Sequence, residues 1–349
     1  MATRLINRFL TEKLEFKEND TVLYKIPRDR AIRRITAWVQ IKVNAGATAP
    51  TGLKHNHYLN LMKKIKLIRN GSDSKITTDG PTKFIADTYE MGVEPYATSS
   101  GTPAASGSFT YNIAFVFDFA INRADLSDFR ALINARRLSS LEFSMQWGAI
   151  KDIFGTVNGC TIDADDTHIS FSLDEVFDNG QPRGQGDQGL DAYLDGAVDI
   201  REQIETEVEI DQARDSFDLD EQSISVRPIP ANVWFELVRA RKNTTDGDPE
   251  DSDDVITHVK YQNIKGGTES IFLDDWIKAI ATLKQDNGLD NAIKGGLFIN
   301  WLRQRQGGLR NLEPDAIKIK ILTKAPASGK KNGVIIWRKF VAGPVGNTT

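Results

Sequence analysis

Two stretches with one plan decide the fold: SKITTDGPTKFIADTYEMG at residues 74–92 and TESIFLDDWIKAIATLKQD at residues 268–286. Each has the pattern of a short polar strand, an acidic turn and one amphipathic helix. The acid of the turn is Asp79 in the first stretch, and Asp274 with Asp275 in the second. Hardly any residues are identical between the two. What repeats is therefore the order of the elements, which indicates two similar domains in tandem.

The segments on either side of these stretches repeat as well. In each half an Ile-Pro pair precedes a long strand, an apolar strand follows the helix, and two further strands come late. The pairs are Ile26-Pro27 and Ile229-Pro230, the long strands 31–43 and 232–242, the strands after the helix 109–122 and 295–304, and the late strands 141–147 with 168–177 and 316–322 with 333–340. The repeated plan thus covers most of the chain.

Length and strand content together indicate the fold class. At 349 residues the chain is too long for one ordinary β-domain and suits two of about 150 residues. Each half offers about eight short strands, and its helices lie in connections, which excludes alternating strand-helix units. An eight-stranded antiparallel sandwich with long connections is a jelly roll. We predict an all-β protein of two tandem eight-stranded antiparallel jelly rolls, each with one or two short helices.

Composition sets the expected domain boundaries. Residues 178–190, DNGQPRGQGDQGL, have the composition of a linker, and a helix is expected over 191–204. The predicted parts are an amino-terminal arm at 1–14, a first jelly roll at 15–177, a linker at 178–204, a second jelly roll at 205–342 and a tail at 343–349. The arm has the pattern either of a short basic amphipathic helix or of a segment that packs on its own or a neighbouring domain.

Charge is unevenly distributed along the chain, although the net charge is only −4. The first 70 residues hold fifteen Lys and Arg against five acids, whereas residues 178–221 hold fourteen acids against three bases. Such runs are most often solvated faces. The alternative is a component of a particle whose basic ends face nucleic acid or lipid headgroups. In that case Arg4, Arg8 and Lys13 would form an arm facing a membrane or genome.

The repeated order of elements resembles that of double jelly-roll major capsid proteins. These proteins build icosahedral viruses and bacteriophages, many with an internal membrane. The resemblance implies a structural protein of the virion, assembled in the host cytoplasm, without enzymatic activity or a small-molecule substrate. It also implies a homotrimer of pseudo-hexagonal outline within a capsid lattice. Minor capsid and vertex proteins would be partners, and the basic arm would contact the internal membrane or the genome.

Clustered acids suggest one metal site. Four aspartates in the loop at 244–254 provide the oxygen ligands that Ca²⁺ prefers: Asp246, Asp248, Asp251 and Asp253. Their spacing does not fit an EF-hand loop, so a solvated acidic loop is the alternative. Asp163, Asp165 and Asp166 form a second, weaker candidate. We expect no other cofactor.

Motifs for catalysis are missing from the sequence. His55 and His57 would share one strand face, but no third ligand follows at a suitable spacing. No nucleophile elbow, phosphate-binding glycine loop or dinucleotide fingerprint is found. Cys160 is the single cysteine, so an internal disulfide is excluded.

The tryptophans distinguish the capsid hypothesis from its main rival. All six lie in apolar alternations and are predicted to pack in the cores: Trp38, Trp147, Trp234, Trp276, Trp301 and Trp337. A carbohydrate-binding or carbohydrate-active double β-sandwich would instead expose a Trp on a sheet face. A non-viral scaffold or tail protein is a further alternative.

Overall fold

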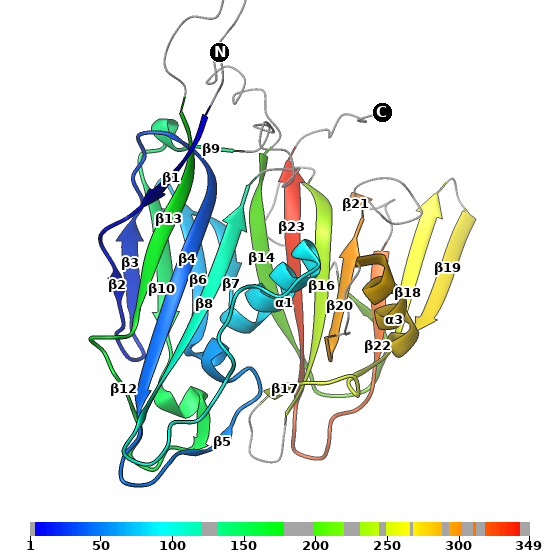
Figure 1. Cartoon of the computed structure of the whole chain (residues 1–349). Coiled ribbons are helices and arrows are strands. Elements are labelled where there is room, and N and C mark those ends of the chain that lie inside the picture. Colours follow the sequence, from blue (N-terminus) through cyan, green and yellow to red (C-terminus); the bar gives the residue numbers. More distant parts are fainter. Residues whose placement is uncertain are drawn as a thin grey trace, which may run out of the picture. The chain divides into compact units, whose positions relative to one another are not determined.

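The chain divides into two compact units. The computed structural model describes residues 4–119, 132–177, 199–219, 231–243, 249–265, 268–287, 293–301, 310–311 and 318–342 (Figure 1). The first unit comprises Met1–Asp87 with Glu94–Arg201, and the second comprises Thr88–Val93 with Glu202–Thr349. The division at Arg201 falls inside the region that the sequence suggests as a linker. Among the helices described, none has the length and apolar character needed to cross a membrane.

One sheet of the first unit is built around the long strand β4 (Ala31–Asn44). Its antiparallel neighbours are β13 (His168–Phe177) and β8 (Ser108–Asp118). Smaller strands complete this sheet: β1 (Arg4–Phe9) and β2 (Leu14–Glu15) pair with β13, and β9 (Ile133–Asn134) and β12 (Thr161–Ile162) pair with β4. Every pairing is antiparallel, as expected for a sandwich.

The second sheet of this unit has the order β7-β6-β10-β3. Its strands are β7 (Asp73–Thr78), β6 (Met62–Arg69), β10 (Leu141–Trp147) and β3 (Thr21–Lys25), and a separate pair joins β5 (Thr51–Leu53) to β11 (Phe154–Thr156). Short 3-10 helices lie in the connections at His57–Leu61, Ala135–Arg137 and Ile150–Asp152. Phe143 of β10 meets Phe171 of β13 edge to face, with ring centroids 5.0 Å apart. Contacts of this kind join the two sheets through one buried apolar cluster.

The second unit is built on the same scheme around β16 (Ala231–Asn243). The strands β23 (Asn332–Ala342), β20 (Gly296–Asn300), β17 (Pro249–Asp251) and β21 (Arg310–Asn311) pair with β16, and β14 (Asp199–Ile210) pairs with β23. The other sheet has the order β15-β22-β18-β19, with β15 at Arg214–Asp218, β22 at Lys318–Thr323, β18 at Ile256–Lys265 and β19 at Thr268–Asp275. A second buried cluster, with Val238, Val259 and Ile321 among its members, fills this sandwich.

The two units repeat each other in their principal strands. In the first unit the central strand β4 pairs with β8 and β13. In the second unit the central strand β16 pairs with β20 and β23, so these three strands correspond to the first three in the same order. The order β7-β6-β10-β3 corresponds to β19-β18-β22-β15. Both helices come between corresponding strands, α1 (Gly80–Met91) after β7 and α3 (Trp276–Asn287) after β19. The prediction of a double jelly roll is therefore confirmed.

The predicted acidic turns are helix caps, and they align the two helices. The Asp79 carboxylate accepts a hydrogen bond from the backbone N–H of Thr82 at 2.6 Å, and the Asp275 carboxylate accepts one from Lys278 at 3.3 Å. In each case the donor is the third residue after the aspartate, as at an N-cap. Since both helices are twelve residues long, Gly80 corresponds to Trp276 and each later residue of α1 to the one at the same place in α3.

Two segments for which a helix was considered are strands, the amino-terminal arm and part of residues 191–204. Residues Arg4–Phe9 form β1, which pairs antiparallel with β13 along its whole length, so the terminal segment packs on its own domain. A helix this short would be marginal in water, whereas pairing with β13 satisfies its backbone. The helix expected over 191–204 is wrong for the part described, because β14 begins at Asp199. Residues 191–198 lie outside the described structure.

Candidate functional site

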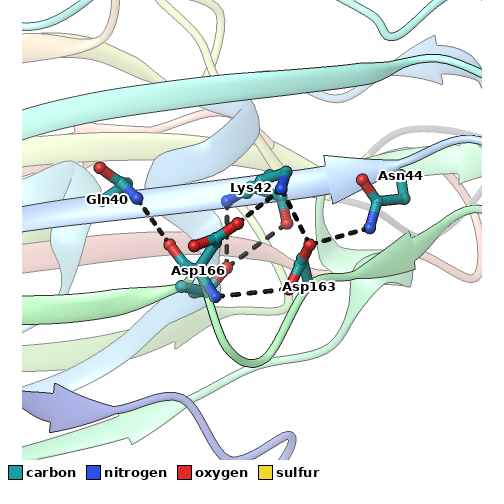
Figure 2. Close-up of polar contacts among 6 residues, drawn as sticks. Gln40, Lys42, Asn44, Asp163 and Asp166 are labelled. Carbon is teal, nitrogen blue, oxygen red and sulfur yellow. Dashed lines mark hydrogen bonds and ion pairs between the residues drawn. The ribbon is translucent and has the colours of Figure 1, made fainter.

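The second metal candidate of the sequence is occupied by a lysine. Lys42 of β4 extends its ammonium group between Asp163 and Asp166, with Nζ 3.1 Å and 2.5 Å from their carboxylate oxygens (Figure 2). Asn44 donates to Asp163 at 3.1 Å, and Gln40 donates to the backbone carbonyl of Asp166 at 2.8 Å. The cluster thus holds the loop between β12 and β13 onto β4.

The electrostatics of this cluster follow from the same contacts. Hydrogen bonds to Asp166 and then Asp163 raise the pKa of Lys42. The hydrogen bond from Asn44, followed by that from Lys42, lowers the pKa of Asp163. Lys42 therefore stays charged at neutral pH and supplies the positive charge that an ion would bring. Asp165 is exposed. The cluster has the geometry of a structural clamp.

The calcium hypothesis for the loop at 244–254 involves residues with other partners. Asp251 binds Arg239 through both oxygens, with Nε–Oδ1 at 2.5 Å and Nη2–Oδ2 at 3.1 Å, and both side chains are buried. Asp253 accepts hydrogen bonds from the indole of Trp276 at 3.3 Å and from the backbone of Gly295 at 2.8 Å. Asp246 and Asp248 lie outside the described residues, so the calcium site stays a prediction.

Other metal candidates gain no support from the part of the chain that is described. Its residues contain no group of three or more His, Cys, Asp or Glu side chains able to hold a metal ion. His57 packs edge to face against Tyr58 and Tyr111, with ring centroids 5.9 Å and 5.5 Å away. Burial, and then the nearby His55, lower the pKa of His57. This histidine is therefore neutral and part of an aromatic cluster.

The basic arm is partly neutralised within its own domain. Arg8 contacts the Asp29 carboxylate at 3.0 Å and that of Glu175 at 3.5 Å, and Arg30 also reaches Glu175 at 3.0 Å. Glu175 is fully buried, so these arginines compensate a charge that would otherwise be costly. Arg4 begins β1. Lys13 borders a shallow polar depression between β2 and β3 and is exposed.

A polar cavity of about 340 Å³ lies in the second unit at the ends of β14, β16 and β23. Its charged side chains pair with one another. Lys331 is 2.5 Å from Glu209, and Arg241 is 3.7 Å from Glu207. The cavity therefore presents a balanced set of charges, and it contains neither a histidine nor a cysteine that could act as a nucleophile or base.

One tryptophan departs from the predicted core packing. Five of the six are buried, but Trp38 of β4 is 40% exposed and Tyr96 beside it is 61% exposed. Their ring centroids are 6.4 Å apart. Trp38 stands opposite Ala114 of β8 and Ser170 of β13, whose small side chains leave the indole uncovered. The outer face of this sheet thus carries an exposed aromatic patch, Trp38 with Tyr96.

Buried ion pairs are the feature that sequence reasoning missed. Arg338 binds Glu236 at 2.7 Å inside the second unit, and Lys83 binds Asp87 inside the first. All four side chains are at most 1% exposed. Lys83 and Asp87 stand four residues apart on one helix, a spacing that signals such a pair. Arg338 and Glu236 lie on different strands, so only the register of β16 with β23 brings them together.

Comparison with known proteins gives matches in structure alone. No protein-family model matches the sequence, and no curated protein matches it. The atomic structure of Sulfolobus Turreted Icosahedral Virus contains a chain similar to this one, with a TM-score of 0.72 and 16% identity over 97% of this chain and 91% of that chain. The crystal structure of the STIV MCP matches with a TM-score of 0.69 and 16% identity, over 98% and 97% of the two chains.

A third match extends the likeness to another virus. The Faustovirus major capsid protein matches with a TM-score of 0.63 and 10% identity, over 98% of this chain and 90% of that chain. These alignments run through both units, since they leave out only a few per cent of the chain. At such low identity they show a common fold, that of two jelly rolls in one polypeptide.

Proposed function

We propose that this protein is the major capsid protein of an icosahedral virus, and that three copies form a capsomer of pseudo-hexagonal outline. The observation that carries the proposal is the likeness in fold, along nearly the whole of both chains, to proteins of viral shells. A match limited to one barrel would be weak, because single jelly rolls serve many functions. Two barrels joined in one chain, each with a helix at the same place, form a much rarer arrangement.

The mechanism of such a protein is geometric. Antiparallel sandwiches with buried ion pairs and continuous apolar cores form stiff blocks, which resist deformation in a shell. Two barrels of one plan give each copy two similar edges, so three copies present six. Contacts between copies need to bury on the order of 1,200–2,000 Å² to be stable. Minor capsid and vertex proteins would join the lattice formed in this way.

The basic amino-terminal region suggests an inward-facing surface. We propose that Lys13 and its neighbour Lys17 contact the genome or an internal membrane, because both carry exposed charge near the start of the chain. Replacing both with glutamate should lower the yield of filled particles without changing the mass of the capsomer. Filled particles at the normal yield would exclude this role.

The proposal is tested by the mass and shape of the purified protein. Light scattering after size exclusion should give three times the 38.9 kDa of one chain. Expression in a host should also yield closed particles visible by negative-stain microscopy. A monomer at all concentrations, without particles, would contradict the proposal.

One observation favours a second candidate function. The exposed Trp38 and Tyr96 are what a carbohydrate-binding β-sandwich would present, because aromatic faces stack on sugar rings. Affinity for a glycan, measured by an array and then by calorimetry, should be abolished by Trp38→Ala if this function holds. A protein that forms trimers and binds no glycan would exclude it.

A further inference from the structure

The two helices have corresponding positions, but one face of them differs in exposure. On α3 five residues are exposed: Ile277, Lys278, Ala281, Thr282 and Gln285. The alignment fixed by the two caps pairs them with five residues of α1 that are all buried: Pro81, Thr82, Ile85, Ala86 and Tyr89. The face that is covered on α1 is therefore open on α3.

The last turn of α1 shows what covers such a face. Within the second unit Tyr89 stacks flat on Phe298 of β20, with ring centroids 5.1 Å apart and an interplanar angle of 2°. Its hydroxyl group donates to the carbonyl of Gly296 at 3.1 Å, and Glu90 pairs with Lys339 of β23 at 2.5 Å. Leu297 and Ile299, the neighbours of Phe298 in the strand, belong to the apolar core. Tyr89 therefore covers the outer face of the sheet formed by β16, β20 and β23.

The corresponding sheet of the first unit is open on its outer face, where Trp38 and Tyr96 are exposed. Its strands β4, β8 and β13 correspond to β16, β20 and β23, and its outer face carries the neighbouring rings of Trp38 and Tyr96. In the second unit Leu237, Phe298 and Trp337 form one cross-strand row on the face that points away from the sandwich core. All three are nevertheless completely buried. In the first unit the comparable row of Ala114, Trp38 and Ser170 leaves the indole 40% exposed.

From this mismatch we infer that α3 of one copy packs its exposed face on the Trp38–Tyr96 patch of a second copy. The contact would repeat between chains the one that the end of α1 makes with the second unit's sheet. It joins two different surfaces, so it is heterologous and can close a ring of copies. This inference deepens the proposed function, on which it rests, by naming the surfaces through which copies meet.

The charges around the patch support a protein partner. Arg34 pairs with Asp174 on one side of Trp38, and Lys42 pairs with Asp163 on the other. These pairs are closed within the chain, so the patch has an apolar centre and a balanced polar rim, as protein interfaces do. Among the described residues beside the patch, these pairs leave no excess of positive charge to select nucleic acid or anionic lipid. The open helix face likewise has an apolar part, Ile277 at 54% exposure with Ala281, beside the polar Lys278, Thr282 and Gln285.

Cysteine cross-linking tests the contact directly. The native Cys160 is buried, so new cysteines would be the reactive ones. The double variant Tyr96→Cys, Ala281→Cys, treated with a short bis-maleimide linker, should give a ladder of two and three linked chains on a denaturing gel. The control is a mismatched variant, Leu23→Cys with Ala281→Cys. It keeps the cysteine on α3 but places the second one on β3 of the opposite sheet, where Leu23 is 48% exposed. It should stay unlinked, as should each single variant.

A substitution provides an independent measurement. Ile277→Asp with Ala281→Asp should weaken association at least tenfold in analytical ultracentrifugation, because both places face the neighbouring patch. Leu23→Asp, also a change of an exposed residue, should leave association unchanged. Equal linking in the matched and mismatched cysteine variants would overturn the inference, as would trimers unaffected by the aspartates. In those cases the protein still forms trimers and the proposed function stands, whereas a monomeric native protein overturns both.

Discussion

Asp251→Asn is the substitution that separates a structural role of the acidic loop from an ion-binding one. The change preserves shape but removes the charge that compensates Arg239, whose side chain is completely buried. At the observed contact of about 3 Å, the attraction is about 5 kcal/mol for an effective dielectric constant of about 20. Because breaking a buried pair leaves one charge unpaired, we expect a loss of about 3–5 kcal/mol in the free energy of unfolding.

Urea unfolding followed by tryptophan fluorescence measures this loss. Trp276, Trp301 and Trp337 all lie in the second unit and report on its transition. A matched control is Glu209→Gln, which breaks an ion pair whose two side chains are more than half exposed, and its transition should barely move. The double variant Arg239→Met, Asp251→Leu should recover most of the lost stability, because it removes both charges together.

The same experiment tests the calcium hypothesis. If Asp251 acts through Arg239, the loss in Asp251→Asn is equal in EDTA and in millimolar Ca²⁺. If it acts as a ligand, only the native protein gains stability from calcium, by mass action. An unchanged transition in Asp251→Asn, or a double variant as unstable as the single one, would refute the ion-pair reasoning.

Three further predictions concern the clamp, the buried histidine and the exposed tryptophan. Lys42→Met should speed hydrogen exchange in residues 163–167, since Asp163 and Asp166 lose their common partner; unchanged protection would contradict the clamp. Burial lowers the pKa of His57 below 6.5 in the folded protein. As the pH falls, the unfolded chain therefore binds the proton before the folded one does. The contribution of neutral His57 to the free energy of unfolding is present above pH 6.5 and is lost as the pH drops below it. His57→Asn should therefore flatten the decline of the melting temperature between about pH 7.5 and pH 5.5, and an equally steep decline would argue against this assignment. Iodide should quench Trp38 in the monomer and not in the assembled protein, whereas Trp38→Phe should remove the quenchable fraction; equal quenching in both states would place Trp38 outside the interface.

The repeat could be predicted from the sequence because it rests on local signals. Asp79 and Asp275 cap their helices at matching places, and such caps depend only on the next few residues. Alternation along β4 likewise marks Ile35, Ala37 and Val39 as inward. The predicted core packing of Trp38 is wrong, because Trp38 lies between the inward Ala37 and Val39 and so points to the opposite face of the sheet.

The polar contacts could not be predicted because they join distant segments. Lys42 and Asp166 stand 124 residues apart, and no local pattern links them. The sequence predicts Asp251 as a calcium ligand or as part of a solvated loop, but β17 pairs with β16 and brings its carboxylate to Arg239. For the amino-terminal arm the sequence allows either a helix or a packed segment. The structure shows a packed strand, and its partner β13 lies more than 160 residues away, where no local pattern could indicate it.

Electron microscopy of the purified protein tests the central claim most directly. If two similar barrels per chain serve to build a shell from trimers, class averages of single molecules should show a closed ring with six lobes. Its mass should correspond to three chains. Particles with two lobes and the mass of one chain, at every concentration examined, would contradict the account.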